Sequence, residues 1–491
     1  MITMKTFIAK TGSIQLPVLG LCIVLLFFPV LCLSMEYPDP LTYLPSLADI
    51  DAHKKMFDDP RPWLTHFGPK QLLPDKMYEQ LTYNVGNMKK QWSELVGFTA
   101  PGEVEKIAPE IKPGKYTCKD MDKYPGLRKL FYKDLLERIK PGGPPFAGSI
   151  PEFEIIPTRQ YYWSLPIAEL TKKNLNRARL DEKGYLIKDT WDGGYPFPRP
   201  EGKFKAQQIM YNVEKRYVGW GGDCFFLARL TSYAKSLRID FQGIFNVKML
   251  RLTGRCILEP YGYYDEGARK REEVKTFALT YISPRDFSGG LQTGMTYNDS
   301  EKPDALMVYM PWTRKVRKLA PRDTQDDLSG QGRIYDDWEG FMQKISPVRY
   351  PYRFELIEER EYLVPAPSLD GAEYVSSEGA ELKNIRFERR PLYVIKMTQL
   401  DPGYVYGSRI FYIDKETFLF YHIENYDKKG RLYRTRDTQY GFFPDSGMFS
   451  WTGPHLIKDH INMRSNVELS FSLPSQWRRR DVNIEELLGA K

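Results

Sequence analysis

The sequence contains few of the residues on which most catalytic and metal sites depend. Among its 491 residues are only 5 Cys and 5 His. It has no Walker loop, no GxSxG nucleophile elbow, no HExxH helix and no GxGxxG turn opening a helix. We therefore expect a protein that is not an enzyme and that needs no metal or other cofactor.

The cysteines beyond the N-terminal segment form no recognisable motif. Cys118, Cys224 and Cys256 show no CxxC spacing, which argues against a zinc site or a redox motif. They permit one disulfide with one thiol left over, and the sequence does not select the pair. The other interpretation is that all three are small buried residues.

An excess of one sign of charge is also largely missing. Lys and Arg number 71 against 63 Asp and Glu, and the net charge of +8 is spread along the chain. This mild basicity does not indicate a nucleic-acid partner. Aromatic residues are abundant instead, at 14% of the chain with 33 Tyr. They favour β-sheet and often line apolar pockets, so the composition favours a β protein that holds a ligand.

The N-terminus has the pattern of an export signal. Lys5 and Lys10 precede an uncharged apolar run over residues 16–33, and Ser34 follows it. This predicts a secretory signal peptide over residues 1–34, cleaved after Ser34. The alternatives are an uncleaved membrane anchor and a lipoprotein in which Cys32 carries the lipid. No later stretch of the sequence is apolar enough to cross a bilayer.

Residues 35–150 are expected to form a helical, loop-rich region. One helix starts at Pro74 and stops at Gly97, because apolar residues recur between them at spacings of four and three. A second apolar stripe ends at Pro141–Gly143. The stripes predict faces packed on a core, and the alternative is a lid over a cavity or a membrane contact. Their residues are Met77, Leu81, Val85, Met88, Trp92 and Leu95, and Leu127, Leu130, Phe131, Leu135 and Ile139.

From about residue 205 the sequence predicts β-strands. Two hairpins are indicated between residues 404 and 440, where short polar turns separate apolar runs. Such units would build a large meandering antiparallel sheet. Many strands are apolar on both faces, so the sheet must be covered on both sides or enclose a cavity. The predicted strands are Phe225–Thr231, Val247–Leu252, Val274–Ser283, Ala305–Met310, Tyr393–Leu400, Tyr406–Ile413, Phe418–Tyr426 and Leu432–Tyr440.

Two clusters invite a metal or catalytic interpretation. His455 and His460 flank Asp459 but are five residues apart, which is not the spacing of a helical metal pair. An acidic cluster around Trp338 has the groups for acid–base chemistry on glycans, but not the spacing of a calcium loop. The favoured interpretation is a solvated loop that pairs with nearby arginines. The acidic residues are Asp323, Asp326, Asp327, Asp336, Asp337 and Glu339.

A basic stretch follows the apolar run 305–312. It predicts a second strand, which is either a charged edge that discourages aggregation or a rim that attracts anionic lipid headgroups or an acidic partner. The segment Trp477–Arg480 is a second basic and aromatic patch with the same two interpretations. The basic residues of the first stretch are Arg314, Lys315, Arg317, Lys318 and Arg322.

Several motifs, taken in order, resemble those of a known family. They are Trp191–Pro198 with Asn212 and Arg216, Tyr309–Pro311 with Arg314–Lys318, Tyr335–Asp337 with Gly340–Phe341, Arg390–Ile395, Arg409–Asp414, and Tyr426–Asp427 with Gly430–Arg434. Together they resemble a domain-of-unknown-function family of exported proteins of two-membrane bacteria. Its members are often labelled outer-membrane lipoprotein-sorting proteins.

The resemblance implies a fold similar to the periplasmic lipoprotein carriers. That fold is mainly β with α, a large curved antiparallel sheet forming an incomplete barrel, with helices covering an apolar cavity. The implied location is the periplasm, at or near the outer membrane. The implied partner is an exporter of the resistance-nodulation-division type or an outer-membrane protein.

We therefore expect an exported envelope protein that binds a hydrophobic ligand, either a lipid or a lipoprotein acyl chain, as a carrier or an accessory to an exporter. The first alternative is a structural or docking subunit that binds no ligand. The second is a glycan hydrolase acting through Asp336, Asp337 or Glu339.

The expected organisation is a signal peptide (1–34), a helical region (35–150), a half-barrel domain (151–475) and a basic tail (476–491). The candidate cavity residues are Trp191, Trp220, Tyr309, Trp312, Trp338, Phe411 and Tyr412. The candidate rim for an anionic partner is formed by Arg314, Lys315, Arg317 and Lys318.

Overall fold

A computed structural model describes most of the chain after residue 43. The described residues are 44–46, 48–60, 70, 73, 75–144, 146–320, 323–327, 331–342, 344–348, 351–369 and 376–489. The predicted signal peptide with Cys32, and also Pro74 and Arg322, lie outside them. Residues 37–491 form one compact unit. None of the helices in the described ranges combines the length and the apolar character needed to span a bilayer.

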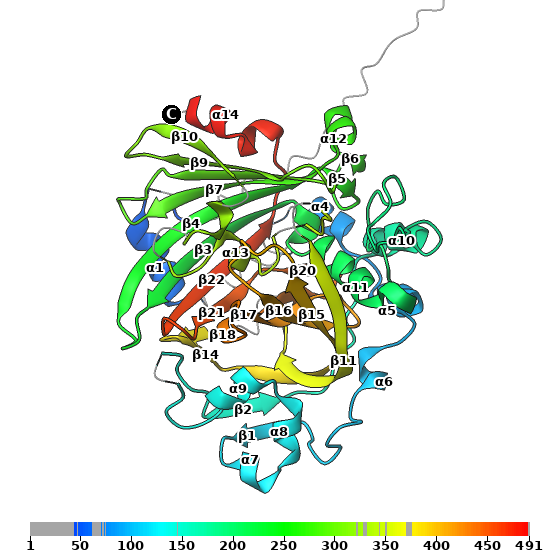
Figure 1. The fold of residues 1–491 in the computed structure, drawn as a ribbon, viewed down its shortest axis with the longest axis vertical. Helices are drawn as coiled ribbons and strands as arrows, with labels where there is room; N and C mark the ends of the chain where they lie inside the picture. The colour runs from blue at the N-terminus through cyan, green and yellow to red at the C-terminus, as the bar shows by residue number, and fades with distance from the viewer. Residues whose placement is uncertain are drawn as a thin grey trace, which may run out of the picture. The chain divides into compact units, whose positions relative to one another are not determined.

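One open sheet of 15 strands dominates this unit (Figure 1). All neighbouring strands are antiparallel except β2 and β15, and β11 (Tyr352–Pro365) pairs with β15 as a branch. The other strands, in spatial order, are β1 (Gly114–Thr117), β2 (Glu152–Ile155), β15 (Arg386–Gln399), β16 (Ser408–Asp414), β17 (Phe420–Tyr426), β18 (Leu432–Thr438), β21 (Gly453–Asp459), β22 (Arg464–Pro474), β3 (Cys224–Tyr233), β4 (Ile239–Arg251), β7 (Glu273–Ser283), β8 (Leu291–Tyr297), β9 (Ala305–Met310) and β10 (Lys315–Leu319).

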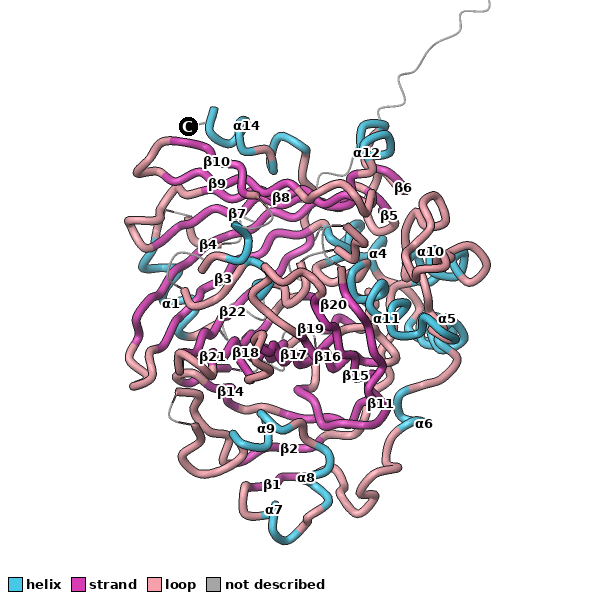
Figure 2. The backbone as a smooth tube through the Cα atoms, in the orientation of Figure 1, coloured by secondary structure: helices cyan, strands magenta, loops and turns pink. Residues whose placement is uncertain are grey.

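Smaller sheets and short helices complete the unit. The small strands are β12 (Ser368–Leu369), β19 (Gly441–Phe443) and β20 (Met448–Ser450) in one sheet, β13 (Ser376–Glu378) with β14 (Glu381–Lys383), and β5 (Thr253–Arg255) with β6 (Gly262–Tyr263). The helices are α1 (Ile50–Asp58), α4 (Asp75–Leu81), α5 (Val85–Val96), α6 (Ala100–Glu103), α7 (Asp120–Lys123), α8 (Gly126–Leu130), α9 (Lys133–Arg138), α10 (Leu165–Asn174), α11 (Lys205–Glu214), α12 (Glu266–Arg271), α13 (Tyr335–Trp338) and α14 (Ile484–Gly489). Helices α5, α10 and α11 lie together beside β11 (Figure 2). The predicted fold class, mainly β with helices and a large, mostly antiparallel sheet that does not close, is confirmed.

The sheet is apolar on both faces because neighbouring side chains of a strand point to opposite sides. On β3, Phe226 and Ala228 join the main core, whereas Phe225 and Leu227 join a second core. We call the side of the sheet to which Phe226 points the inner face and the side to which Phe225 points the outer face. Helix α1 covers the outer face, where Phe57 lies 5.4 Å from Phe471 between ring centroids.

The predicted strands are all present, but the two predicted helices are each broken. Residues 75–96 form α4 and α5, and Asn84 between them caps α5 by accepting a 2.9 Å hydrogen bond from Asn87 N–H. Gly97 ends α5 in the left-handed conformation, as expected. The second stripe is divided between α8 and α9. Its apolar residues are nevertheless buried in the main core, so the predicted packing is confirmed.

The C-terminal segment packs on the outer face. Trp477 is buried there and donates to the carbonyl of Cys224 at 3.0 Å. Arg479 is paired with Asp265 and Glu273. Two residues of the predicted basic and aromatic patch are thus engaged within the protein.

Candidate functional site

The inner face is covered by a segment that belongs to no strand. Residues 331–342, here called the plug segment, lie between β10 and β11 in the sequence and contain α13. Trp338 packs edge-on against Phe277, with ring centroids 5.5 Å apart. Phe341 also packs edge-on, against Phe411, with ring centroids 5.9 Å apart. Side-chain contacts therefore anchor the plug segment, and it could leave without breaking a strand ladder.

Two aspartates join the plug segment to arginines of the sheet. Asp336 is paired with Arg409 on β16. Asp337 is paired with Arg434 on β18 at 3.0 Å. All four side chains are at most 5% exposed, so these are buried ion pairs. The hydroxyl of Tyr404 donates a 2.7 Å hydrogen bond to Asp336, and that of Tyr406 donates one of 2.7 Å to Asp337.

Glu339 is a third anchor of the plug segment. It accepts hydrogen bonds from Arg216 at 2.9 Å and from Lys275 at 3.2 Å. Burial alone would raise the pKa of Glu339, but the charges of Lys275 and Arg216 outweigh it and lower that pKa. Glu339 is therefore held as an anion between two cations.

These contacts correct the prediction of a solvated acidic loop. Asp336, Asp337 and Glu339 are buried, whereas Asp326 and Asp327 are exposed. The predicted pairing with arginines is confirmed. A glycan hydrolase needs an acid of raised pKa in an open cleft, and Glu339 has the opposite shift. The cluster therefore favours an anchoring role.

The Trp191–Pro198 motif and the residues that follow it are also connected to the plug segment. The Asn212 side chain binds both the N–H and the carbonyl of Phe197, at 2.9 and 2.7 Å. A Cβ on Gly194 would lie only 2.7 Å from the backbone nitrogen of Thr171, so the chain passes where only glycine is tolerated. Arg216, just beyond α11, then reaches Glu339. Motifs far apart in the sequence thus converge on the plug segment.

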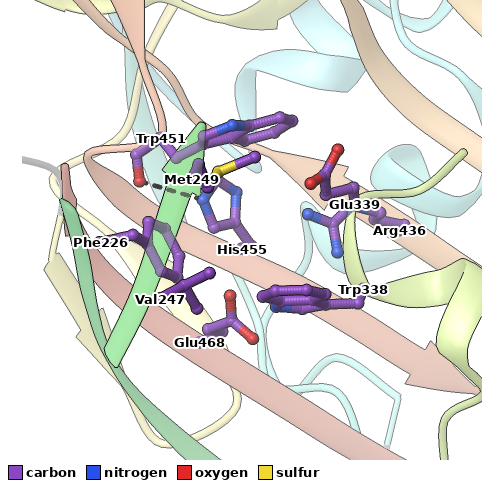
Figure 3. Close-up of a pocket in the computed structure, with 9 residues that line it drawn as sticks. All are labelled: Phe226, Val247, Met249, Trp338, Glu339, Arg436, Trp451, His455 and Glu468. Carbon is purple, nitrogen blue, oxygen red and sulfur yellow. Dashed lines mark hydrogen bonds between the residues drawn. The ribbon is translucent and has the colours of Figure 1, made fainter. Parts of the chain in front are cut away.

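A small cavity remains between the plug segment and the sheet (Figure 3). The space open to the centre of a water molecule is about 20 Å³, which is room for roughly one water. Its lining combines apolar side chains with a few buried polar ones. The lining residues are Phe226, Val247, Met249, Trp338, Glu339, Arg436, Trp451, His455 and Glu468.

Two larger clefts open at the surface. One of about 630 Å³ lies at β1, β2 and residues 382–386, and one of about 460 Å³ lies at α10, α11 and residues 196–201. Both are lined by charged as well as apolar side chains, and neither is lined by any of the seven candidate aromatic residues.

The seven candidate cavity residues do not gather at one place. Trp338 lines the cavity, and Phe411 lies behind the plug segment on the inner face. Tyr412 points to the opposite side, where its hydroxyl donates to Glu424 at 3.3 Å. The remaining four lie elsewhere: Trp191 and Trp220 are buried, Tyr309 is half-buried on β9, and Trp312 is 60% exposed in the β9–β10 turn.

The candidate rim residues share one hairpin. Arg314 lies in the β9–β10 turn, and Lys315, Arg317 and Lys318 lie on β10. All four are exposed, and β10 is the last strand of the sheet. The predicted second, basic strand is confirmed, and its attraction for an anionic partner stays a prediction.

One buried cluster has the composition of a metal site. The ligand atoms of Asp134, His422 and Asp437 lie within 4.8 Å of one another. Arg138 already pairs with both aspartates, at 3.2 Å to Asp134. Because this guanidinium supplies the compensating charge, we interpret the cluster as a buried ion-pair network.

The two C-terminal histidines do not converge. Nε2 of His455 lies 3.2 Å from Oγ of Ser470 in the cavity wall. Nε2 of His460 lies 3.0 Å from Oγ1 of Thr435. His455 lies on strand β21 and His460 lies in the turn after it, so the two rings are in different environments.

The three described cysteines form no disulfide among themselves. Burial raises the pKa of the Cys224 thiol and that of the Cys256 thiol, each to about 12. Those two thiols are therefore protonated and unreactive at neutral pH.

The chain is similar to a known protein family and to a curated bacterial protein. The family model described as "Protein of unknown function (DUF1329)" matches residues 146–476. A curated protein of Pseudomonas aeruginosa, "Uncharacterized protein PA3922", is 25% identical over 323 residues, which are 62% of this chain and 66% of that protein. The chain thus spans just under two thirds of the length of this relative. The family match confirms the resemblance drawn from the motifs.

Two solved structures are similar at low identity. A DUF1329 family protein from Desulfovibrio piger is 13% identical, covering 54% of this chain and 92% of that chain with a TM-score of 0.37. The LolA superfamily protein NE2245 from Nitrosomonas europaea is 14% identical, covering 57% and 98% with a TM-score of 0.34. Both likenesses are too distant to support an inference about function.

Proposed function

The chain belongs to the DUF1329 family, whose description names no activity, and from its own site we propose that it is an exported envelope protein that binds a hydrophobic ligand. The ligand class is a lipid or the acyl chain of a lipoprotein. It would occupy the inner face when the plug segment moves aside. In that role the protein serves as a periplasmic carrier, or as an accessory to an envelope exporter or an outer-membrane partner.

The observation that carries this proposal is the apolar inner face under the plug segment. Phe226, Val247 and Met249 are the apolar side chains of β3 and β4 that line the cavity there, beside the polar side chains of other strands. Burying about 14 CH₂ groups on such a surface would contribute roughly 11 kcal/mol, at roughly 0.8 kcal/mol each. Ordering the ligand subtracts several kcal/mol, and so do separating the buried ion pairs of the plug segment and exposing its apolar side chains Trp338 and Phe341. The net affinity would then be moderate and reversible, as a carrier requires.

The same geometry supports a second candidate, a docking subunit that binds no ligand. The cavity of about 20 Å³ is far below the roughly 300 Å³ or more of typical ligand pockets. If the plug segment stays in place, the inner face is simply a packed core. The two candidates differ in whether loosening the plug segment changes ligand uptake.

The test compares two variants. One removes an anchor of the plug segment, and the other breaks an equally buried ion pair elsewhere. Glu339→Gln removes the anion between Arg216 and Lys275. Asp223→Asn removes the partner of Arg255, a 2.8 Å buried pair that does not involve the plug segment. Binding of a fluorescent fatty acid is titrated for the wild type and both variants.

We expect Glu339→Gln to bind the fatty acid at least about threefold more tightly than the wild type, because the open state becomes more populated. Asp223→Asn should bind like the wild type. Equal behaviour of the two variants, or no uptake by any of the three proteins, would contradict ligand binding under the plug segment and favour the docking subunit.

A further inference from the structure

Six turns between neighbouring strands lie at one end of the large sheet. They are residues 234–238, 284–290, 311–314, 400–407, 427–431 and 460–463, here called the hairpin end. The strand register places them together: Ser465 is opposite Tyr233, which is opposite Ile239. The β3–β4 and β9–β10 turns both lie on the left of Figure 1.

Apolar side chains are exposed at and beside these turns. Trp312 is 60% exposed and Ile239, next to the first turn, is 51% exposed. Leu237, Leu400, Ile461 and Met463 are exposed as well. These are six of the twelve large apolar side chains found exposed among the described residues. Their concentration at one end marks it as a contact surface.

The same turns are strongly basic. They contain seven Lys or Arg residues and three Asp residues. Asp427 is already paired with Arg431, and Arg238 is paired with Asp240 near the start of β4. Lys428 and Lys429 are exposed in the β17–β18 turn, and Lys315 continues the charge along β10. An anionic partner is therefore favoured over a cationic or neutral one.

We propose that the hairpin end docks on the surface of an anionic lipid bilayer. Trp312 and the aliphatic tips would enter the interface, while the lysines and arginines face the headgroup phosphates. A protein partner would need a separate pocket for each apolar tip, because the tips come from different turns. A bilayer interface takes up apolar tips from different turns without a pocket for each, so lipid is the occupant that this surface fits best.

The hairpin end also lies next to the anchors of the plug segment. Arg409 and Arg434 lie close to the starts of β16 and β18, and the turn 427–431 leads directly into β18. Docking would therefore bring a bilayer close to the two arginines that hold Asp336 and Asp337. The docking itself does not depend on the proposed ligand.

The test is co-sedimentation of the full chain with vesicles. One set consists of phosphatidylglycerol and phosphatidylcholine in equal parts, and the other of phosphatidylcholine alone. The charge-reversing variant is Lys428→Glu with Lys429→Glu. The matched control is Lys172→Glu with Lys173→Glu, an exposed lysine pair on α10. Any contribution of residues 1–34 is the same in every protein, and an unchanged unfolding temperature shows that each variant is folded.

We expect binding to the anionic vesicles that weakens with added salt and falls by about tenfold or more in the Lys428/Lys429 variant only. A second variant, Trp312→Ser with Ile239→Ser, should lose binding in the same way. Absence of vesicle binding, equal binding to both vesicle types, or equal loss in the control pair would overturn the proposal. The first of these outcomes would leave an acidic protein as the partner.

Discussion

At the scale of single residues, His455 shows how strongly this interior perturbs its ionisable groups. Its side chain is buried in the cavity wall. Its Nε2 lies 3.2 Å from Oγ of Ser470 and 3.3 Å from the carbonyl oxygen of Trp451. Burial first, and then the charge of Arg436, lowers the pKa of His455 to about 3. The ring is therefore neutral in the folded protein at any ordinary pH, although it sits among charged side chains.

His455 should make stability fall as the pH drops. The folded pKa lies below the ordinary value of 6.5. Between these two values the unfolded chain binds the proton more readily, so the stability present above pH 6.5 is lost on acidification. From pH 7 to pH 5 we expect the wild type to lose about 2 kcal/mol more than His455→Gln. Urea unfolding at both pH values measures this, and parallel pH dependences of the two proteins would contradict it.

The sequence identifies the residue types of the site but not their environment. The acidic residues around Trp338 and the arginines of the family motifs are visible as patterns. Their pairing is not, because Asp337 and Arg434 are 97 positions apart and meet only in the folded sheet. A charged cluster met in a sequence is usually solvated, and here tertiary packing buries it. Arg216 has no local signal beyond its place after the Trp191–Pro198 motif.

At the scale of elements, the predicted strands are those with a clear apolar run, although alternation of charged and apolar residues also marks a strand. Ala305–Met310 is β9 as expected, whereas the long strand β11 (Tyr352–Pro365) alternates charged with apolar residues and was not predicted. The segment containing His455 is strand β21 rather than a histidine motif. The first predicted helix breaks because Asn84 supplies a capping side chain inside the apolar stripe.

The plug segment depends on Gly340 for its close approach to the sheet. Gly340 has a φ of 79°, and a Cβ there would lie 2.7 Å from the Phe420 ring and from Ile423. Gly430 has a φ of 75°, and a Cβ added there would meet only open space. Gly430→Ala should cost about 1 kcal/mol of stability from the backbone alone. Gly340→Ala should cost about 1–3 kcal/mol more, because the added methyl overpacks the interface.

Urea unfolding of the two alanine variants checks this difference. Both positions carry similar backbone strain, so the Gly430 variant serves as the control for the conformational part. If the two variants are equally stable, the plug segment is not packed on Phe420 as described. A larger loss in the Gly340 variant supports the close contact.

At the scale of the whole molecule, the two apolar faces of the sheet require two different coverings. The outer face is closed by α1 and the C-terminal segment near β3, and by the segment containing α8 and α9 near β16 and β17, where Tyr132 packs on Tyr412 and His422. The inner face is closed by the plug segment, where a ligand cavity was expected. Alternating apolar strands show that both faces are buried, but the sequence does not say whether protein or ligand buries them. That question decides between a carrier and a docking subunit.

Native mass spectrometry of the protein purified from the periplasmic fraction tests the central claim most directly. Solvent extraction of the same sample then identifies whatever is bound. The proposed function predicts a lipid or another hydrophobic molecule at close to one per chain, with a higher occupancy in Glu339→Gln. A ligand-free mass for both proteins, together with no uptake of a fluorescent fatty acid, would contradict it.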